Sequence, residues 1–551
     1  MTKKWILSFV LAFYFNLYGF NPADYAPAEN EIYGEIAPLE VATEQIKGFL
    51  VELTGAALFE TLQAQLSLRL GFDLFNHEEL TNMGFDIKTP WGFSGSWGKE
   101  PSFSLYIPTK DSLKLYQILR NLAEQEANSQ HSSQKLTTDE EFQDMEEGNP
   151  SAFSKLPKEF QEIKVNELFT LKEGNQIAYV ARTNKFVFVS NEPQFSESKL
   201  QPAAKPISSE SYYATLKEYY RRKNGGKIPL GSLYLHPSTL RRIEEQNFPI
   251  YGEALSQALL EEMEKNIEGI GGFWGFESKK TILSFAYLYR KGYLRDKNFL
   301  LARILQTTGQ KITLQFFPEL PVLYLALNIN LPPLIDFMIE KDPQLRDNLK
   351  TTRDKLAQDF PWDIAKDLLR AFSGNIAALV AKLPPEKNLR DYEAWVWYAN
   401  FGIIPEKKAV LKDFLDALVR TRKRQKNPEF SVSLRKVQGQ ELYILSYTPQ
   451  KGKAMRIYLL FSGNEILLSG NENIGKIPTG SKHLVREITG YENPNAFFYV
   501  NLSAIIDFLA KSNMKAFILP YLPYLRSFSS LHMVSGSETD ITFSDFVIRL
   551  K

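Results

Sequence analysis

The chain has 551 residues, with 65 Lys and Arg, 64 Asp and Glu, 5 His and no Cys. A formal net charge of +1 argues against a general nucleic-acid binder, which needs an excess of basic residues. The absence of Cys excludes disulfides, zinc–thiolate sites, iron–sulfur clusters and Cys nucleophiles. A hydrophobic content of 44% is enough to build packed cores, so the chain as a whole is not disordered.

The N-terminal residues 1–20 have the layout of a secretory signal. Lys3 and Lys4 precede the segment Trp5–Phe20, which is almost wholly apolar, with an interruption at Asn16. A helix of that length spans about 24 Å, less than the ~30 Å hydrocarbon core of a bilayer. We therefore predict a cleaved signal peptide and a periplasmic or secreted location in a bacterium, with an uncleaved N-terminal anchor or a buried core helix as the alternatives.

The rest of the chain is predicted to contain two similar halves. The matched strand segments are residues 31–39 with 323–331, 103–110 with 395–405, 186–192 with 466–472, and 233–238 with 498–503. The second pair of strands leads in each half to apolar residues at helical spacing, starting at Leu115 and at Leu411. We predict a first repeat over 30–292 and a second over 320–551. The alternative is that any chain with mixed strands and helices gives such matches.

The first half is longer because it contains two polar segments. Residues 123–162 are rich in Gln, Ser and acidic residues, and residues 196–211 contain Pro202, Pro206 and several serines. Both segments are predicted to be surface insertions that are partly disordered.

Two predicted β-hairpins indicate the fold class. One lies over 271–289, and the other over 528–550 with its turn at Ser535–Glu538. Consecutive hairpins favour antiparallel sheets, so we expect an α+β fold of two tandem halves, each a mainly antiparallel sheet with packed amphipathic helices. The Gly-rich stretch 269–275 leads into a strand rather than a helix, so it is predicted to be a turn or bulge and not a phosphate loop.

No motif identifies a catalytic or metal site. The five His residues are at positions 77, 131, 236, 483 and 532, and His77 begins a zinc-protease-like motif that has Thr81 where its second His is required. Gly92–Ser96 lacks the final Gly of a nucleophile elbow. The Ser-x-x-Lys spacing of a Ser–Lys hydrolase occurs at 196–199, 433–436 and 512–515, as chance allows in this composition. We therefore predict no catalytic, cofactor-binding or metal-binding residue.

Two basic clusters and one aromatic row are the remaining candidate surfaces. The clusters are 221–223 and 420–426, and the second is expected to be a solvated helix end favoured by the helix dipole, with contact to acidic lipid, polysaccharide or a partner as the alternative. Trp395, Trp397 and Phe401 share one strand face and are expected in the core. If exposed, they would suggest a carbohydrate or peptide surface.

Several short segments together resemble a known pattern. They are Gly71–Asp73, Glu79–Leu80, Met83–Asp86, Phe103–Ile107 with Lys110–Asp111, and Ala371–Leu379. In these segments the chain resembles the exported bacterial family catalogued as domain of unknown function 3352. The resemblance implies an exported α+β protein and brings no catalytic residues. Asp73 and Asp86 are expected to be turn or helix-cap residues.

Together these features predict an exported, non-enzymatic binding or scaffold protein. Its partner would be another protein, an envelope component or a small apolar ligand, with no nucleic acid, and with peripheral membrane or polysaccharide contact as a further option. The alternative is an extracytoplasmic hydrolase with its site in a cleft between the two halves.

Overall fold

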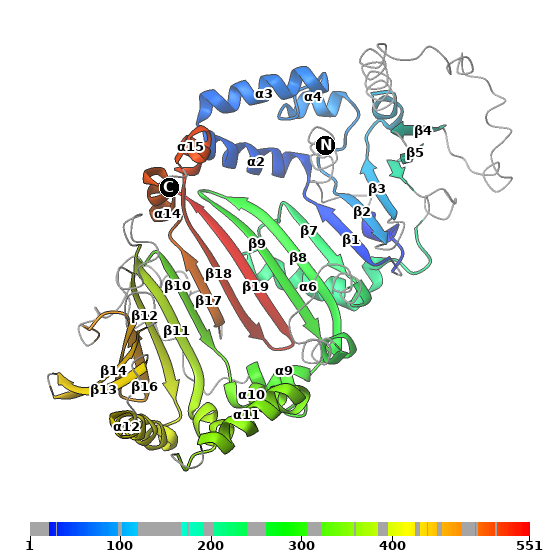
Figure 1. Cartoon of the computed structure of the whole chain (residues 1–551). Helices are drawn as coiled ribbons and strands as arrows, with labels where there is room; N and C mark the ends of the chain where they lie inside the picture. The colour runs from blue at the N-terminus through cyan, green and yellow to red at the C-terminus, as the bar shows by residue number, and fades with distance from the viewer. Residues whose placement is uncertain are drawn as a thin grey trace, which may run out of the picture. The chain divides into compact units, whose positions relative to one another are not determined.

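A computed structural model gives the fold (Figure 1). The residues that it describes are 21–28, 30–96, 102–118, 167–173, 176–191, 202–239, 261–305, 321–356, 360–383, 395–424, 430–437, 439–448, 455–472, 474, 491, 494–512 and 515–551. The predicted signal peptide and the predicted insertion 123–162 lie outside the described residues.

The chain forms two compact units. Unit 1 comprises Met1–Gln246 and Glu268–Leu283, and unit 2 comprises Asn247–Ile267 and Ser284–Lys551. The predicted repeats 30–292 and 320–551 overlap these units without sharing their boundaries, since the last strand of the first predicted repeat pairs with the C-terminal strand of the chain.

Unit 1 is built on an antiparallel sheet with the order β8-β7-β1-β2-β3-β6-β5-β4. The strands are β1 (Ile32–Ile36), β2 (Trp91–Ser96), β3 (Ser102–Pro108), β4 (Glu167–Glu173), β5 (Gln176–Arg182), β6 (Phe186–Ser190), β7 (Gly231–Leu235) and β8 (Ile267–Glu277). The helices are α2 (Leu39–Thr54), α3 (Ala56–Leu70), α4 (His77–Asn82) and α6 (Ser211–Lys223), with short 3-10 turns at Pro22–Asp24 and Ile207–Ser209. Residues 112–118 are also helical, as predicted from the spacing that starts at Leu115.

Unit 2 is built on an antiparallel sheet with the order β9-β19-β18-β17-β10-β11-β12-β16-β15-β14-β13. The strands are β9 (Lys280–Tyr289), β10 (Leu323–Asn328), β11 (Phe372–Lys382), β12 (Val396–Ile403), β13 (Phe430–Val437), β14 (Gln440–Tyr447), β15 (Met455–Ser462), β16 (Glu465–Ser469), β17 (Pro494–Val500), β18 (Phe528–Glu538) and β19 (Ile541–Leu550). The first four residues of β9, 280–283, belong to unit 1.

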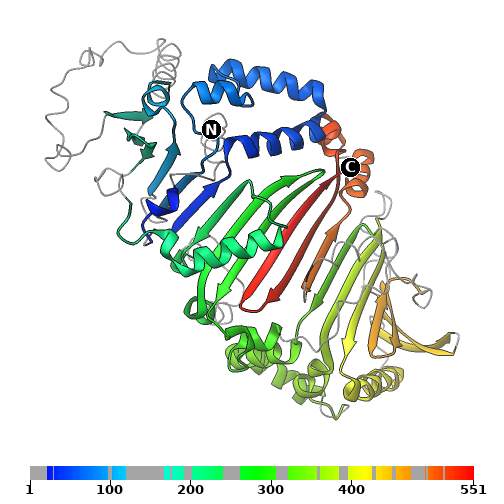
Figure 2. The same cartoon turned by 180° about the vertical axis from the view of Figure 1, so that it is seen from behind.

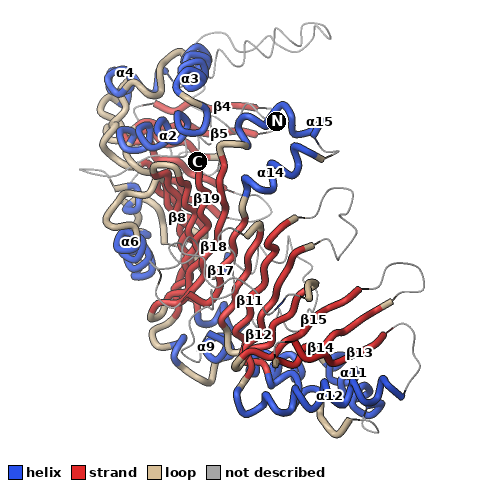
Figure 3. The backbone as a smooth tube through the Cα atoms, turned by 90° about the vertical axis from the view of Figure 1, so that its left-hand side faces the viewer, coloured by secondary structure: helices blue, strands red, loops and turns tan. Residues whose placement is uncertain are grey.

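The described helices of unit 2 lie at the ends of these strands or on one face. They are α9 (Leu300–Leu305), α10 (Leu331–Lys341), α11 (Pro343–Leu356), α12 (Lys408–Arg424), α14 (Leu502–Lys511), α15 (Lys515–Ile518) and α16 (Leu522–Leu525), with a π-helical turn at Ile364–Leu368 and 3-10 turns at Tyr293–Arg295, Leu369–Ala371, Pro405–Lys407 and Leu519–Tyr521. Residues 261–266, just before β8, are also helical. Figure 3 shows α14 and α15 beyond the ends of β17 and β18. The α+β class with antiparallel sheets is as predicted.

The same strand order and register recur in the two sheets. In unit 1, Tyr33 of β1 lies opposite Tyr234 of β7, and in unit 2, Tyr324 of β10 lies opposite Tyr499 of β17. The matched serines also agree: Ser190 lies opposite Tyr179 in one sheet, as Ser469 lies opposite Tyr458 in the other. A duplicated chain would give this repeated order; the duplication itself stays a prediction.

Alternation along the strands creates two cores in unit 1. Ile107 and Val187 join a cluster with Trp91 and Leu39, beneath α2. Their strand neighbours Tyr106, Phe186 and Phe188 point to the opposite face, where they form a second cluster with Ala181 of β5 and with Tyr25. Successive strand residues point to opposite faces, so both faces of this sheet are packed.

The Gly-rich stretch is a strand interior, so the prediction of a turn or bulge was wrong. Residues 269–275 lie within β8, and their pairing with β7 is regular. A Cβ built at Gly269 would lie 2.5 Å from the ring of Tyr212, because α6 packs directly on the strand. Figure 2 shows α6 across this face of the sheet. Here glycine serves the close approach of a helix rather than a change of chain direction.

The turn of the C-terminal hairpin also differs from its predicted position. Glu538 pairs with Ile541, so the loop is Thr539–Asp540, and Ser535 and Gly536 are strand residues of β18. Thr539 has a φ of 50°, the left-handed conformation that tight two-residue hairpin loops need. The hairpin at β8 and β9 has its predicted turn, with Ser278 and Lys279 between the strands.

Part of the second predicted insertion is packed. Residues 202–210 contain the fully buried Ile207, whose amide donates to the carbonyl of Ala26, and the amide of Ala28 donates to the carbonyl of Lys205. Residues 196–201 lie outside the described part of the chain.

Gly374 of β11 tests how closely the backbone packs at the start of that strand. Gly374 has a φ of +89°, and a Cβ there would lie 2.1 Å from the carbonyl oxygen of Ile329. We expect Gly374→Ala to lower the free energy of unfolding by about 3 kcal/mol in a urea titration. The control is Gly439→Ala, at a similar φ but in open space, which should cost about 1 kcal/mol. Equal losses would show that the contact with Ile329 is not tight.

Candidate functional site

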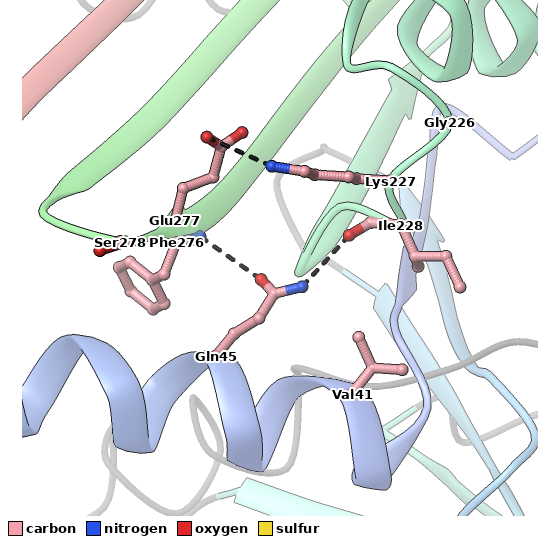
Figure 4. A pocket seen from close by; sticks show the side chains of 8 residues that line it. All are labelled: Val41, Gln45, Gly226, Lys227, Ile228, Phe276, Glu277 and Ser278. Atoms are coloured by element: carbon pink, nitrogen blue, oxygen red, sulfur yellow. Dashed lines mark hydrogen bonds and ion pairs between the residues drawn. The ribbon is translucent and has the colours of Figure 1, made fainter.

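Three features of the described chain are candidates for a binding or catalytic site: an open hollow, a buried ionisable cluster and an apolar sheet face. The first is an open hollow of about 560 Å³ in unit 1 (Figure 4). It is lined by Val41 and Gln45 of α2, by Gly226, Lys227 and Ile228 after α6, and by Phe276, Glu277 and Ser278 at the end of β8. Gly226 has a φ of +80°, so glycine lets the chain turn sharply from α6 into this wall.

Hydrogen bonds and ion pairs already link the walls of this hollow. The Gln45 side chain donates to the Ile228 carbonyl at 3.2 Å and accepts from the Phe276 amide at 3.4 Å. Glu277 lies 3.6 Å from the Lys227 ammonium and 2.7 Å from that of Lys280. Burial by itself raises the pKa of Glu277, but hydrogen bonds and charges from Lys280 and Lys227 outweigh it and hold the pKa below its usual value. This hollow can accept a small polar group. Ser278 of its lining donates its hydroxyl to the Glu52 carboxylate at 3.0 Å in an exposed position, and the same carboxylate accepts from the Lys279 amide, so this contact closes the β8–β9 turn onto α2.

The second feature is a buried cluster around Glu35 in β1. Glu35 is 5% exposed, and its carboxylate accepts hydrogen bonds from Tyr33 at 3.1 Å, from Lys217 at 2.8 Å and from the hydroxyl of Tyr213. Lys217 also donates to the Tyr213 hydroxyl at 2.7 Å. A buried carboxylate is tolerated when it is paired and fully hydrogen-bonded, as this one is.

The tyrosines of the cluster stay protonated well beyond their usual range. Tyr234 belongs to the same cluster, since the centre of its ring lies 4.7 Å from that of Tyr213. Burial raises the pKa of Tyr33, Tyr213 and Tyr234 well above 10, and the negative charge of Glu35 raises it further. Protonated phenols are the donors that the Glu35 carboxylate needs. Tyr213 and Lys217 are one turn apart on α6, so the cluster joins this helix to the sheet. None of its residues lines the hollow described above.

The third feature is an apolar face on the sheet of unit 2. Directly opposite residues share a face, and the register aligns two rows across five strands. The rows, called here the apolar face, are Val380, Leu323, Val500, Leu531 and Ile548, and Ala378, Leu325, Phe498, Met533 and Phe546. Every one of these side chains is partly exposed. Their strand neighbours on the other face are buried in a cluster that includes Tyr324, Leu379, Tyr499 and Val534.

The same face is covered further along the sheet. Over β12, β14, β15 and β16 it packs under α12, in a cluster that includes Leu411, Leu415, Tyr443, Leu459 and Ile466. Trp397, which lies opposite Val380, and Phe401 are only partly exposed. The prediction that Trp395, Trp397 and Phe401 form a core row on one strand was therefore wrong in part. Trp395 precedes β12, and all three side chains are partly exposed because α12 covers the face beyond this strand.

The sequence candidates for catalysis are not brought together. Ser433 and Lys436 lie in β13, where a spacing of three puts side chains on opposite faces. Ser512 donates its hydroxyl to the Leu509 carbonyl. The pair at 196–199 lies outside the described residues.

The described histidines have structural partners. His77 lies 2.6 Å from the Thr43 hydroxyl, His236 lies 2.8 Å from that of Ser238, and His532 is 2% exposed beside Phe497. His131 and His483 lie outside the described residues. Within the part of the chain that the structure describes, no group of three or more His, Asp or Glu residues could hold a metal ion.

The two aspartates named from the family resemblance act as turn residues. Asp73 accepts from the amide of Phe75 at 2.9 Å, and Asp86 accepts from the amide of Lys88 at 3.1 Å. This prediction is confirmed. Ala371–Leu379 coincides with the start of β11, the strand expected there.

The basic clusters both end helices. Residues 221–223 form the last turn of α6, with Arg221 paired to Glu218 and Lys223 close to the ring of Tyr219. Arg420 to Arg424 end α12 as predicted, and Gln425 and Lys426 lie outside the described residues.

Comparison with known proteins adds little. No protein-family model matches the chain, and no curated protein matches it. Two solved structures match, crystal forms IV and I of TP0453, each with 10% identity and a TM-score of 0.21. They cover 52% of this chain, and the matches span 86% and 87% of those chains. A TM-score this low carries no argument, and the resemblance to domain of unknown function 3352 stays a prediction.

No helix among the described residues is both long and apolar enough to cross a membrane.

The Glu35 cluster predicts a large loss of stability on truncation. We expect Glu35→Ala to lower the free energy of unfolding by about 2–3 kcal/mol, because two buried hydroxyls lose their acceptor, whereas the Lys217 side chain is 38% exposed and regains water. The matched control is Glu218→Ala on α6, whose exposed pair with Arg221 should leave the urea midpoint unchanged. Similar midpoints for both variants would contradict the account of Glu35.

The same cluster predicts alkaline sensitivity. The folded pKa values of Tyr33, Tyr213 and Tyr234 are raised above the unfolded value of about 10, so their contribution to stability is complete below about pH 10 and is lost as the pH rises above it. Titration of tyrosinate absorbance should show a group of tyrosines that ionise only when the chain unfolds, and replacing Tyr33, Tyr213 and Tyr234 together by Phe should make that group smaller by three. If all of them ionised near pH 10 in the folded protein, the buried cluster would be wrong.

Proposed function

We propose that the chain is an exported, non-enzymatic binding protein whose ligand is a small, elongated apolar molecule. The observation that carries the proposal is the apolar face of unit 2. An antiparallel sheet with one packed face usually presents polar side chains on the other. Here the partly exposed face is apolar in both rows and on all five strands.

The dimensions of this face favour an elongated ligand. Strands are spaced by about 4.8 Å, so the five strands from β11 to β19 span about 19 Å. A linear alkyl chain laid across the strands would contact one side chain of each. Contact is worth about 25 cal/mol per Å² of apolar surface removed from water, and ten partly exposed side chains supply such surface.

One edge of the face is polar and could orient a ligand with a polar end. The next row begins with Ile376, Leu327 and Ala496 but ends with Ser535 and Ser544, whose hydroxyls lie 2.7 Å apart. An amphiphile with a carboxylate or hydroxyl head could hydrogen-bond to these serines while its chain follows the apolar rows. A long-chain fatty acid has this chemistry.

A binding function is preferred to the hydrolase alternative on chemical grounds. The Glu35 cluster is the kind of buried ionisable group that a hydrolase needs, but its carboxylate, hydroxyls and ammonium bond to one another. Its role in holding α6 on the sheet accounts for each of these contacts. Location outside the cytoplasm rests on the apolar N-terminal segment alone.

Substitution in the two rows tests the proposal. Leu325→Asn and Met533→Gln keep the approximate shape of each side chain and make it polar. Each is expected to weaken binding of a fluorescent long-chain fatty acid about tenfold, measured as the Kd in a fluorescence titration. The control is Leu434→Asn, at a leucine of β13 that is 39% exposed and outside the face. No binding by the unmodified chain, or equal affinity in all variants, would contradict the proposal.

A further inference from the structure

The connection between β17 and β18 exposes a second, separate apolar surface. Four large side chains stand out within eight residues: Phe517 is 77% exposed, Leu519 53%, Tyr521 63% and Tyr524 41%. We call these four residues the aromatic patch. Single exposed hydrophobic residues are ordinary on a soluble protein, but a contiguous group with three aromatic rings indicates a binding surface.

The patch is held outward by an ordered backbone. Leu522 is 9% exposed and anchors the segment between the exposed residues. The amide of Arg526 donates to the Leu522 carbonyl at 3.0 Å, and the amide of Ser527 donates to the Tyr524 carbonyl at 3.0 Å. Pro520 and Pro523 restrict the chain in the short turns. The exposed rings therefore belong to a defined surface.

The charges around the patch are mostly positive. Lys511, Lys515 and Arg526 bracket it and are exposed, whereas Asp507 is the one acidic residue from Leu502 to Arg526. Exposed basic side chains beside an apolar surface are complementary to a partner that is apolar inside and negatively charged at its surface.

We propose that the aromatic patch docks onto the surface of an anionic lipid bilayer. Tyrosine suits this position because its ring enters the apolar region while its hydroxyl remains with the head groups. Phe517 and Leu519 supply the side chains that enter the acyl region, and the bracketing lysines and arginine contact lipid phosphates. The helical turns that carry the patch have four residues or fewer, so the contact with the bilayer is shallow and lies in the plane of its surface.

This surface goes beyond the proposed function and does not depend on it. The patch follows α14, after the end of β17, whereas the apolar face lies along the strands themselves. Vesicle binding and fatty-acid binding can therefore fail separately: a patch variant should lose the first and keep the second, and Met533→Gln should do the reverse.

Sedimentation with vesicles tests the proposal on the full chain. The probe is a set of vesicles of phosphatidylglycerol and phosphatidylcholine in equal parts, compared with pure phosphatidylcholine. The triple variant Phe517→Ser, Leu519→Ser and Tyr521→Ser should reduce partitioning about tenfold or more. The matched control changes exposed leucines elsewhere to serine, namely Leu62, Leu68 and Leu434. This control should partition like the unmodified chain. All the variants contain the same apolar N-terminal segment, so that segment does not account for differences between them.

The charge component is tested apart from the apolar one. Lys515→Gln and Arg526→Gln should each lower partitioning onto the anionic vesicles roughly fivefold, with a much smaller effect on neutral ones. Added salt should weaken binding of the unmodified chain in the same direction.

A second measurement does not depend on lost binding. The chain has no native Cys, so Tyr521→Cys and Leu68→Cys each give one site for an environment-sensitive fluorophore. Anionic vesicles should shift the emission to shorter wavelength at 521 and leave it unchanged at 68. Unchanged emission at 521, or normal partitioning of the triple variant, would overturn the proposal. A third result would also overturn it: the unmodified chain self-associates, never binds vesicles, and becomes monomeric in the triple variant. The patch would then be a contact between two copies of the chain.

Discussion

The two-residue alternation of antiparallel strands is the constraint on which the rest of this structure depends. Each strand sends successive side chains to opposite faces, and the cross-strand register joins them into rows. The rows through Tyr33 and Tyr234 in unit 1 and through Tyr324 and Tyr499 in unit 2 fix the covered faces. A shift by one residue would exchange the two faces of a strand, so this register also fixes which side chains remain accessible.

The two units use this constraint differently. In unit 1, α6 and its Tyr213 and Lys217 cover one face, and the cost of burying Glu35 is offset by three hydrogen bonds. In unit 2, α12 covers one stretch of a face and leaves five strands with partly exposed apolar rows. Since apolar surface that meets water is unfavourable, these rows are the feature that supports the proposed binding of an apolar ligand. The aromatic patch is a different case, because its side chains stand on short turns beyond the strands.

Much of the fold could be predicted from local patterns, whereas the sites could not. Alternation and helical spacing located β10, β16 and α12, and the α+β class followed from consecutive hairpins. The turn near Ser535 was misplaced because a Ser-Gly-Ser sequence resembles a loop, while the true turn needs only one left-handed residue. The Glu35 cluster joins residues 178 positions apart, which no local pattern reports. A signal existed nonetheless: a Glu in an otherwise apolar strand, and Tyr and Lys one turn apart on a helix. The partial exposure of Trp397 depends on how far α12 extends over the face of the sheet, and this follows from tertiary packing rather than from local sequence.

The most direct test of the central claim is to locate a bound ligand on the chain. A photoreactive long-chain fatty acid can be cross-linked to the full protein, and the modified peptides identified by mass spectrometry. The account predicts labels on β10, β17, β18 and β19, at residues such as Leu325, Phe498 and Met533, and competition by unlabelled fatty acid. Labels confined to the hollow beside Gln45 and Lys227, or no saturable label at all, would contradict it.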